Sequence, residues 1–271
     1  MFAALGYGEQ VKNRFRRCTG RIFGEKIIPV KVTVGCGECF FTAEVSPGAR
    51  IRWNELFLRM CRLSREMVIP DELQIPDGCG ITRFVPQSLR PRVVMNSALE
   101  LLERYGGPRI PVTAVDPYGR LCGRIIPLVR CCADVRVVTD NSALYRRAAE
   151  RIMEEYGASI QVCPRGEGAI RPGVAVFPFG MEESTAPAET VCIVPEGELP
   201  QENRIAVGGI RLGAEYRAIK PAGLSDFLFA SALYEKCGLR EMGALAGAEL
   251  KCGGTALTPE RAATLFSAYN G

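Results

Sequence analysis

An alternation of strand-like and helix-like segments, starting at residue 112, constrains the fold of this chain more than any other feature. Runs rich in β-branched residues at Val112 to Val115, Val135 to Thr139 and Ser159 to Cys163 are separated by helical patterns at Gly119 to Cys132 and Ser142 to Tyr156. Strands that alternate with helices of this length usually pair in parallel through right-handed crossovers. We therefore predict a parallel sheet in which the first of these strands is central and pairs with the second.

The remainder of the chain extends this α/β pattern. Two further apolar strands are expected at Val174 to Phe177 and Thr190 to Val194. Helices are predicted at Ser225 to Cys237 and at Pro259 to Tyr269, where Thr258 is suited to cap the second helix and proline is tolerated at the first helical position. Residues 108–271 are thus expected to form an α/β domain with a C-terminal helical segment.

The chain before this region follows a different, α+β pattern. Two β-rich runs, Ile27 to Val34 and Cys39 to Val45, predict a hairpin, and apolar residues at spacings of three and four in Trp53 to Met67 predict an amphipathic helix. A short helical stretch at Ser97 to Tyr105 ends at the chain breaker Gly106-Gly107-Pro108. The length of 271 residues suits two domains. We place the boundary between residues 107 and 108 and assign no role to the N-terminal α+β domain.

The segment VTAVDPYGRLCGRIIPLVRCCADVRVVTD resembles the Rossmann dinucleotide-binding family. That family has a glycine-rich turn after its first strand and an acidic residue at the end of its second strand, which bind pyrophosphate and ribose. The resemblance places Pro117, Gly119 and Cys122 at the three glycine positions, with Gly123 one residue later, and places Asp140 at the ribose position. It implies an NAD-type cofactor over residues 117–123, although only Gly119 matches the glycine pattern.

The chain contains no histidine. A Ser-His-Asp triad, a Cys-His pair and an HExxH zinc site within this chain are therefore excluded, and acid or base chemistry would fall to other side chains. Tyr216 and Lys220 have the YxxxK spacing of short-chain dehydrogenases, in which the lysine lowers the pKa of a tyrosine acid. Because Pro221 directly follows the lysine and disfavours a continuing helix, a strand with both side chains on one face is the favoured alternative.

Cys36 and Cys39 form a CxxC pair at the expected hairpin turn. Two thiolates at this spacing can share a zinc ion, and a dithiol can also be redox-active. A second CxxC motif is absent from the sequence, and several other cysteines, such as Cys132 and Cys192, lie in apolar segments. We expect reduced structural thiols and no bound metal.

Location and partners are predicted from what the sequence lacks. No apolar run has the length of a membrane-spanning helix, and the first residues do not resemble a signal peptide, so a cytoplasmic protein without a membrane partner is expected. The basic stretch from Lys12 to Arg21 contains Phe15, but an exposed basic face explains it, and nucleic-acid binding is not expected. Homo-oligomerisation stays open.

The sequence is consistent with two functions. The first is a nucleotide-cofactor (NAD-type) binding oxidoreductase with an unknown small-molecule substrate, with a substrate domain ahead of the dinucleotide domain as in shikimate-dehydrogenase-like enzymes. The alternative is a non-catalytic Rossmann-like protein whose degenerate site acts in ligand sensing or protein–protein interaction. The missing glycines favour the alternative.

Overall fold

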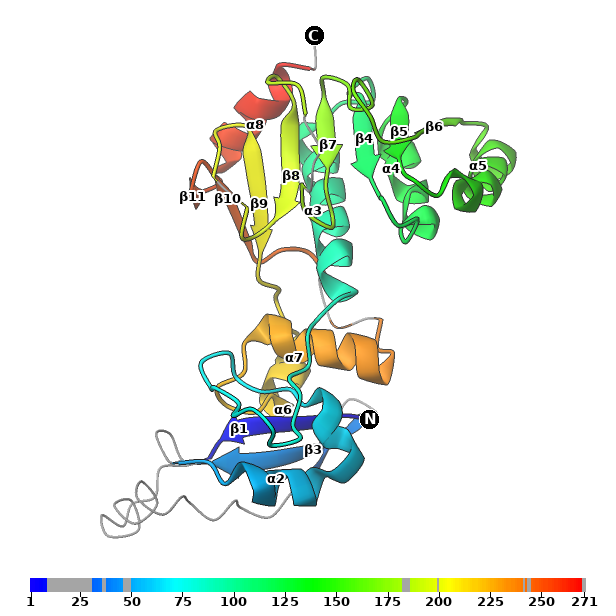
Figure 1. Ribbon diagram of the computed structural model, residues 1–271. Coiled ribbons are helices and arrows are strands. Elements are labelled where there is room, and N and C mark those ends of the chain that lie inside the picture. The colour runs from blue at the N-terminus through cyan, green and yellow to red at the C-terminus, as the bar shows by residue number, and fades with distance from the viewer. Residues whose placement is uncertain are drawn as a thin grey trace. The chain divides into compact units, whose positions relative to one another are not determined.

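A computed structural model describes residues 1–8, 31–35, 38–45, 50–181, 186–198, 200–240, 242 and 245–269. The chain forms two compact units, and the path of the chain crosses between them three times (Figure 1). Unit 1 combines residues 1–89 with 211–244, and unit 2 combines residues 90–210 with 245–271. The domain division between residues 107 and 108 stays a prediction, since these units are divided at other positions.

Unit 1 is built on a three-stranded sheet in the order β1-β3-β2. Strand β1 (Ala3–Tyr7) is parallel to β3 (Glu38–Val45), and β2 (Lys31–Gly35) is antiparallel to β3. The second pairing confirms the expected hairpin from Lys31 onward, and residues 27–30 of the predicted first strand lie outside the described residues. Strand β1 was not predicted.

The helices of unit 1 come from both of its chain segments. The helix predicted over Trp53 to Met67 is α-helical only at α2 (Trp53–Met60) and continues as the 3-10 helix η1 (Cys61–Glu66). The predicted helix Ser225 to Cys237 forms α7 (Asp226–Ala232) and a π-helical turn, η3 (Leu233–Cys237). The Ser225 hydroxyl accepts a hydrogen bond from the Leu228 amide at 3.1 Å and so caps α7.

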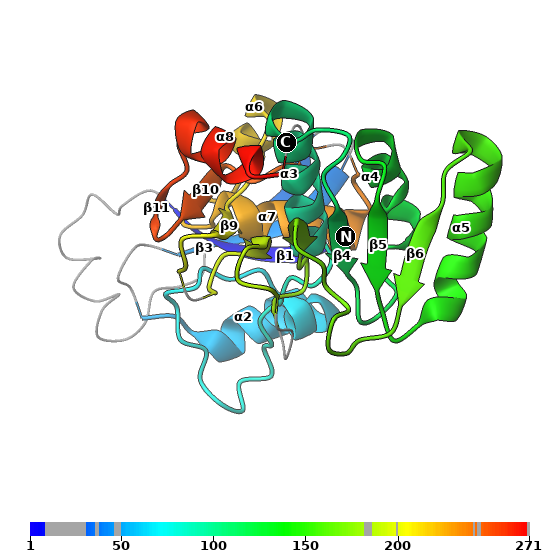
Figure 2. The ribbon, with the colours of Figure 1, turned by 90° about the horizontal axis from the view of Figure 1, so that it is seen from above.

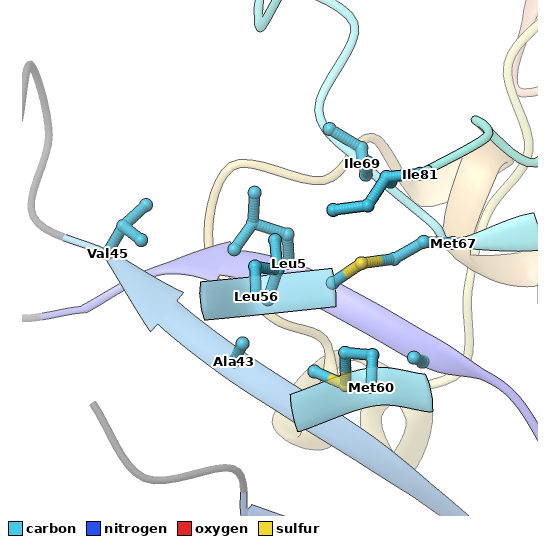
Figure 3. Packing of buried hydrophobic residues seen from close by; sticks show 9 residues of the cluster. Leu5, Ala43, Val45, Leu56, Met60, Met67, Ile69 and Ile81 are labelled. Carbon is cyan, nitrogen blue, oxygen red and sulfur yellow. The ribbon is translucent and has the colours of Figure 1, made fainter. Parts of the chain in front are cut away.

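The core of unit 1 lies between the sheet and α2. Figure 3 shows Leu56 and Met60 of α2 beside Leu5 of β1 and Ala43 of β3, and all four side chains are buried. Burying these apolar side chains is the main stabilising contribution to such a small sheet.

Unit 2 contains an eight-stranded sheet in the order β11-β10-β9-β8-β7-β4-β5-β6. Strands β4 to β9 are parallel to their neighbours, and β10 and β11 are added antiparallel at one edge. The strands are β4 (Val112–Val115), β5 (Val135–Val138), β6 (Ile160–Cys163), β7 (Val174–Val176), β8 (Val191–Pro195), β9 (Arg204–Gly208), β10 (Glu249–Cys252) and β11 (Thr255–Ala256).

The strand order identifies the fold class. From β4 the chain moves outward through β5 and β6, then returns to place β7, β8 and β9 on the other side of β4. This is the order of doubly wound dinucleotide-binding sheets, whose direction reverses between the first and fourth parallel strands. The predicted α/β fold with a Rossmann-like parallel sheet is confirmed, as is the parallel pairing of β4 with β5.

The helices of unit 2 match the predictions unequally. Helix α5 (Ser142–Tyr156) has the predicted bounds, and it lies next to β6 at the edge of the sheet (Figures 1 and 2). The segment predicted as one helix from Gly119 to Cys132 instead contains the 3-10 helix η2 (Cys122–Arg124) and α4 (Ile126–Cys131). The other helices are α3 (Leu89–Tyr105), whose first residue belongs to unit 1, and α8 (Pro259–Ser267).

Among the described residues, no helix combines the length and the apolar character that crossing a membrane requires. The cytoplasmic location stays a prediction.

Candidate functional site

The turn after β4 is a tight β-turn, and it contains the residues that the Rossmann resemblance placed at the pyrophosphate. The Gly119 amide donates to the Asp116 carbonyl at 3.2 Å, so Pro117 and Tyr118 are the two central residues of the turn. Aspartate, proline and glycine are favoured at the first, second and fourth positions of type I turns. The local sequence therefore favours a β-turn that is closed by its own backbone hydrogen bond.

Asp116, the first residue of this turn, is fully buried. Its Oδ2 accepts hydrogen bonds from the Leu121 amide at 2.7 Å and from the Tyr145 hydroxyl at 2.6 Å. Its Oδ1 is also buried and has no hydrogen-bond partner among the residues that the structure describes. The Leu121 amide, two residues after the turn, is thus bound by the protein's own carboxylate.

Tyr145 connects the turn to α5 and is itself fully buried. Burial raises the pKa of its hydroxyl, and the hydrogen bond and negative charge of Asp116 raise that pKa further. The phenol therefore stays protonated and donates to Asp116 over the whole physiological pH range.

The backbone conformation at Gly119 favours glycine, and an added side chain would also meet the start of α5. Gly119 has a φ of +69°, and a Cβ placed there would lie 2.5 Å from Leu144 Cδ1 and 3.2 Å from Asn141 Cβ. The Asn141 side-chain amide also donates to the Pro117 carbonyl at 3.2 Å. The single glycine that matches the Rossmann pattern is thus packed against the start of α5. Cys122 is partly buried, and Gly123 is exposed.

Asp140, the predicted ribose ligand, lies beyond the end of β5 and forms an ion pair with Arg165, which follows β6. The Arg165 guanidinium lies 2.5 Å from Asp140 Oδ2, and the two side chains are 40% and 43% exposed. Sequence reasoning identified Asp140 but not its partner. The carboxylate is accessible, but a ribose would have to displace or accommodate the guanidinium.

Aromatic side chains meet where the strand order reverses. Tyr118, after β4, and Phe179, after β7, contact each other edge to face with ring centroids 5.5 Å apart. The Arg120 guanidinium lies 5.1 Å from the centroid of the Tyr118 ring. The loops on the two sides of the reversal are therefore in contact.

Tyr216 and Lys220 lie in unit 1, and the strand interpretation of this segment is wrong. Tyr216 belongs to helix α6 (Ala214–Ile219), and Lys220 is its C-cap residue with extended backbone. The Lys220 ammonium lies 2.5 Å from Asp226 Oδ1, and the Tyr216 side chain is buried. Pro221 ended the helix as expected but did not prevent one from forming before it. A catalytic role of these residues stays a prediction.

Only one cysteine of the CxxC motif lies within the described residues. Cys36 lies outside the described residues, and Cys39 has a free, partly buried thiol. Within the ranges that the structure describes, no three cysteine, aspartate or glutamate side chains are grouped so as to hold a metal ion. A role of Cys36 and Cys39 in metal binding stays untested.

A separate cleft of about 480 Å³ lies between the C-terminal part of α3 and α4. Its lining includes Glu103, Arg130 and Cys131. The Cys131 thiol donates to Glu103 Oε1 at 3.7 Å, and burial together with the charge of Glu103 raises the pKa of this thiol. A raised pKa keeps the thiol protonated, which makes it a poor nucleophile.

Comparison with known proteins adds little to this description. No protein-family model matches the chain, and no curated protein matches it. One solved structure that is similar, the L-tryptophan dehydrogenase from Nostoc punctiforme, shares 11% identity with a TM-score of 0.31, over 99% of this chain and 79% of that one. The strand order of unit 2 thus carries the assignment to the class of Rossmann-like α/β proteins.

Proposed function

We propose that this chain is a non-catalytic Rossmann-like protein whose degenerate dinucleotide site serves ligand sensing or protein–protein interaction. The observation that carries this proposal is the buried Asp116 carboxylate in the turn after β4. In working dinucleotide sites, the amides of this turn and the N-terminus of the following helix bind the pyrophosphate.

Three features of the turn and of the segment after it disfavour the binding of an anionic ligand such as a pyrophosphate. The Asp116 carboxylate brings negative charge and engages the Leu121 amide. Pro117 has no amide to donate. The crossover begins with the three-residue helix η2 and continues in the six-residue α4, so the long helix whose dipole favours a pyrophosphate is missing at this turn.

A second candidate function is the NAD-type oxidoreductase, and Asp140 is the observation in its favour. Asp140 follows the second parallel strand and is exposed, as a carboxylate that binds ribose hydroxyls must be. Arg165 beside it could bind a 2′-phosphate, so a cofactor site here would select between NAD and NADP only moderately. This candidate requires the pyrophosphate to bind without the Leu121 amide.

Titration calorimetry with NAD, NADP and S-adenosylmethionine separates the two functions. The proposal predicts no saturable heat for any of them at millimolar ligand, with wild type and with Asp140→Ala alike. A suitable control is Asp134→Ala, because Asp134 is a similarly exposed aspartate paired with an arginine, Arg171, at 3.5 Å. Saturable NAD binding that Asp140→Ala weakens at least tenfold and Asp134→Ala leaves unchanged would show a working dinucleotide site, and so contradict the degenerate site and favour the oxidoreductase candidate.

A further inference from the structure

Helix α5 exposes most of its surface. Of its fifteen residues only Tyr145 and Ile152 are buried, and they point to the same side of the helix. Three large apolar side chains, Leu144, Met153 and Tyr156, are between 43% and 53% exposed. Most of the surface of α5 is therefore not packed against its own sheet.

The charges near the two ends of α5 have the opposite sign to those that the helix dipole favours. Arg146 and Arg147 lie near its N-terminus and Glu154 and Glu155 near its C-terminus, with no acidic residue in the first turn and no basic residue in the last. The helix dipole favours the reverse arrangement, with acidic side chains at the N-terminus and basic ones at the C-terminus. The helix dipole therefore does not explain the placement of these charges.

The spacing of charges along α5 does not tip the balance either way. Like charges lie four residues apart at Arg147 and Arg151 and at Glu150 and Glu154, and opposite charges lie at the same spacing at Arg146 and Glu150 and at Arg151 and Glu155. Within the described part of the chain, Arg151 pairs with Glu155 at 2.7 Å, whereas Arg146, Arg147, Glu150 and Glu154 form no ion pair. Two basic and two acidic side chains are thus available to a partner.

We propose that α5 is the contact surface for a second copy of this chain, packed antiparallel across a two-fold axis. Arg147, Glu150 and Glu154 are spaced by three and four residues and form one stripe on the side of the helix away from Tyr145 and Ile152. An antiparallel pair brings the Arg146–Arg147 end of each helix beside the Glu150–Glu154 region of the other. The pattern is self-complementary, as a two-fold interface requires.

The contact is small, because a helix of fifteen residues is about 22 Å long. One such helix pair buries less than the roughly 800 Å² per partner of a standard stable interface. The dimer is therefore weak and reversible, it forms in the micromolar range or above, and it weakens as salt screens the charges. This inference does not depend on the proposed function, since none of these four charged residues belongs to the turn after β4.

Sedimentation equilibrium from micromolar to several hundred micromolar protein tests the proposal. We expect wild type to dimerise, and both Arg146→Glu/Arg147→Glu and Glu150→Arg/Glu154→Arg to raise the dimer dissociation constant at least about tenfold, because like charges then face each other. Mixing these two variants restores association as a heterodimer. The quadruple variant that combines all four substitutions also dimerises. Its acidic and basic positions are exchanged, so opposite charges again face each other across the two-fold axis.

Two controls make the result decisive. Circular dichroism checks that each variant is folded, and Arg171→Glu reverses an exposed arginine outside α5 and leaves dimerisation unchanged. A wild type that is monomeric at every concentration would overturn the proposal. So would a dimer that both double variants leave intact, since its interface would lie elsewhere.

Discussion

Asp116 and Asp140 follow neighbouring parallel strands at the same edge of the large sheet, but they differ in every other respect. Asp116 is fully buried and binds a backbone amide and a tyrosine hydroxyl, whereas Asp140 is exposed and pairs with Arg165 across the surface. The same residue type at equivalent strand ends thus holds the fold together in one case and is accessible to solvent in the other. Burial and hydrogen-bond partners separate these roles, and strand position alone does not.

The largest effect is expected for Asp116→Ala. The substitution leaves the Leu121 amide and the Tyr145 hydroxyl without an acceptor in a buried environment, so we expect a loss of about 3 kcal/mol in the free energy of unfolding. Urea denaturation measures this loss. Asp116→Asn keeps one acceptor oxygen and should lose about half as much. Equal, small losses for both variants would contradict a structural role of the carboxylate.

Gly119→Ala is expected to lose about 2 kcal/mol, through both strained backbone and the contact with Leu144. Gly168→Ala is the matched control, because Gly168 has a similar φ of +72° but nothing within 4 Å of the added Cβ. The control should lose only about 1 kcal/mol, which is the backbone contribution. Thermal unfolding of the two variants compares them directly, and identical losses would mean that the contact with α5 is unimportant.

Tyr145→Phe is expected to lose about 1.5 kcal/mol at neutral pH, the contribution of a hydrogen bond to a charged group. The pH dependence of the free energy of unfolding tests whether the protonated Tyr145 hydroxyl is the cause of this loss. The pKa of Tyr145 is raised in the folded protein, so its stabilising contribution is complete below the tyrosine pKa of the unfolded chain and is lost as the pH rises above it. Above about pH 10 wild type should lose stability faster than the variant, by up to about 1.4 kcal/mol per pH unit. Parallel curves would contradict the buried, protonated phenol.

The smallest effect is expected for Asp140→Ala. An exposed ion pair contributes little, so the free energy of unfolding should change by less than about 0.5 kcal/mol, and less still at high salt. A loss comparable with that of Asp116→Ala in the same urea titration would remove the contrast between the two strand ends.

Much of the unit 2 fold could be predicted because runs of β-branched residues alternate with helical patterns, and because α5 is a long amphipathic helix. The bounds of β4 and α5 agree with the predictions to the residue, and those of β5 and β8 to within one residue. Strands β1, β9, β10 and β11 were missed. Strand β1 precedes the strand–helix alternation, and β10 and β11 are added antiparallel at the edge, outside that alternation.

The candidate site could be predicted only in part. The family pattern pointed to Gly119 and Asp140, but it gave no weight to Asp116 or Tyr145, which are 29 residues apart and meet only in the fold. The sequence did contain one local signal, the Asp-Pro-Tyr-Gly turn directly after a buried strand. A short helix at Tyr216 was misread because six residues are too few to show a helical period.

The central claim, that Asp116 engages the amide which a pyrophosphate would otherwise bind, can be tested at the Leu121 amide itself. In a protein labelled with ¹⁵N-leucine, the Leu121 resonance is assigned from its loss in Leu121→Ile. We expect this amide to exchange slowly with deuterium, to lose that protection in Asp116→Ala, and to keep its chemical shift when NAD is added at millimolar concentration. A saturable shift of the Leu121 resonance with NAD in the wild-type protein would contradict the account.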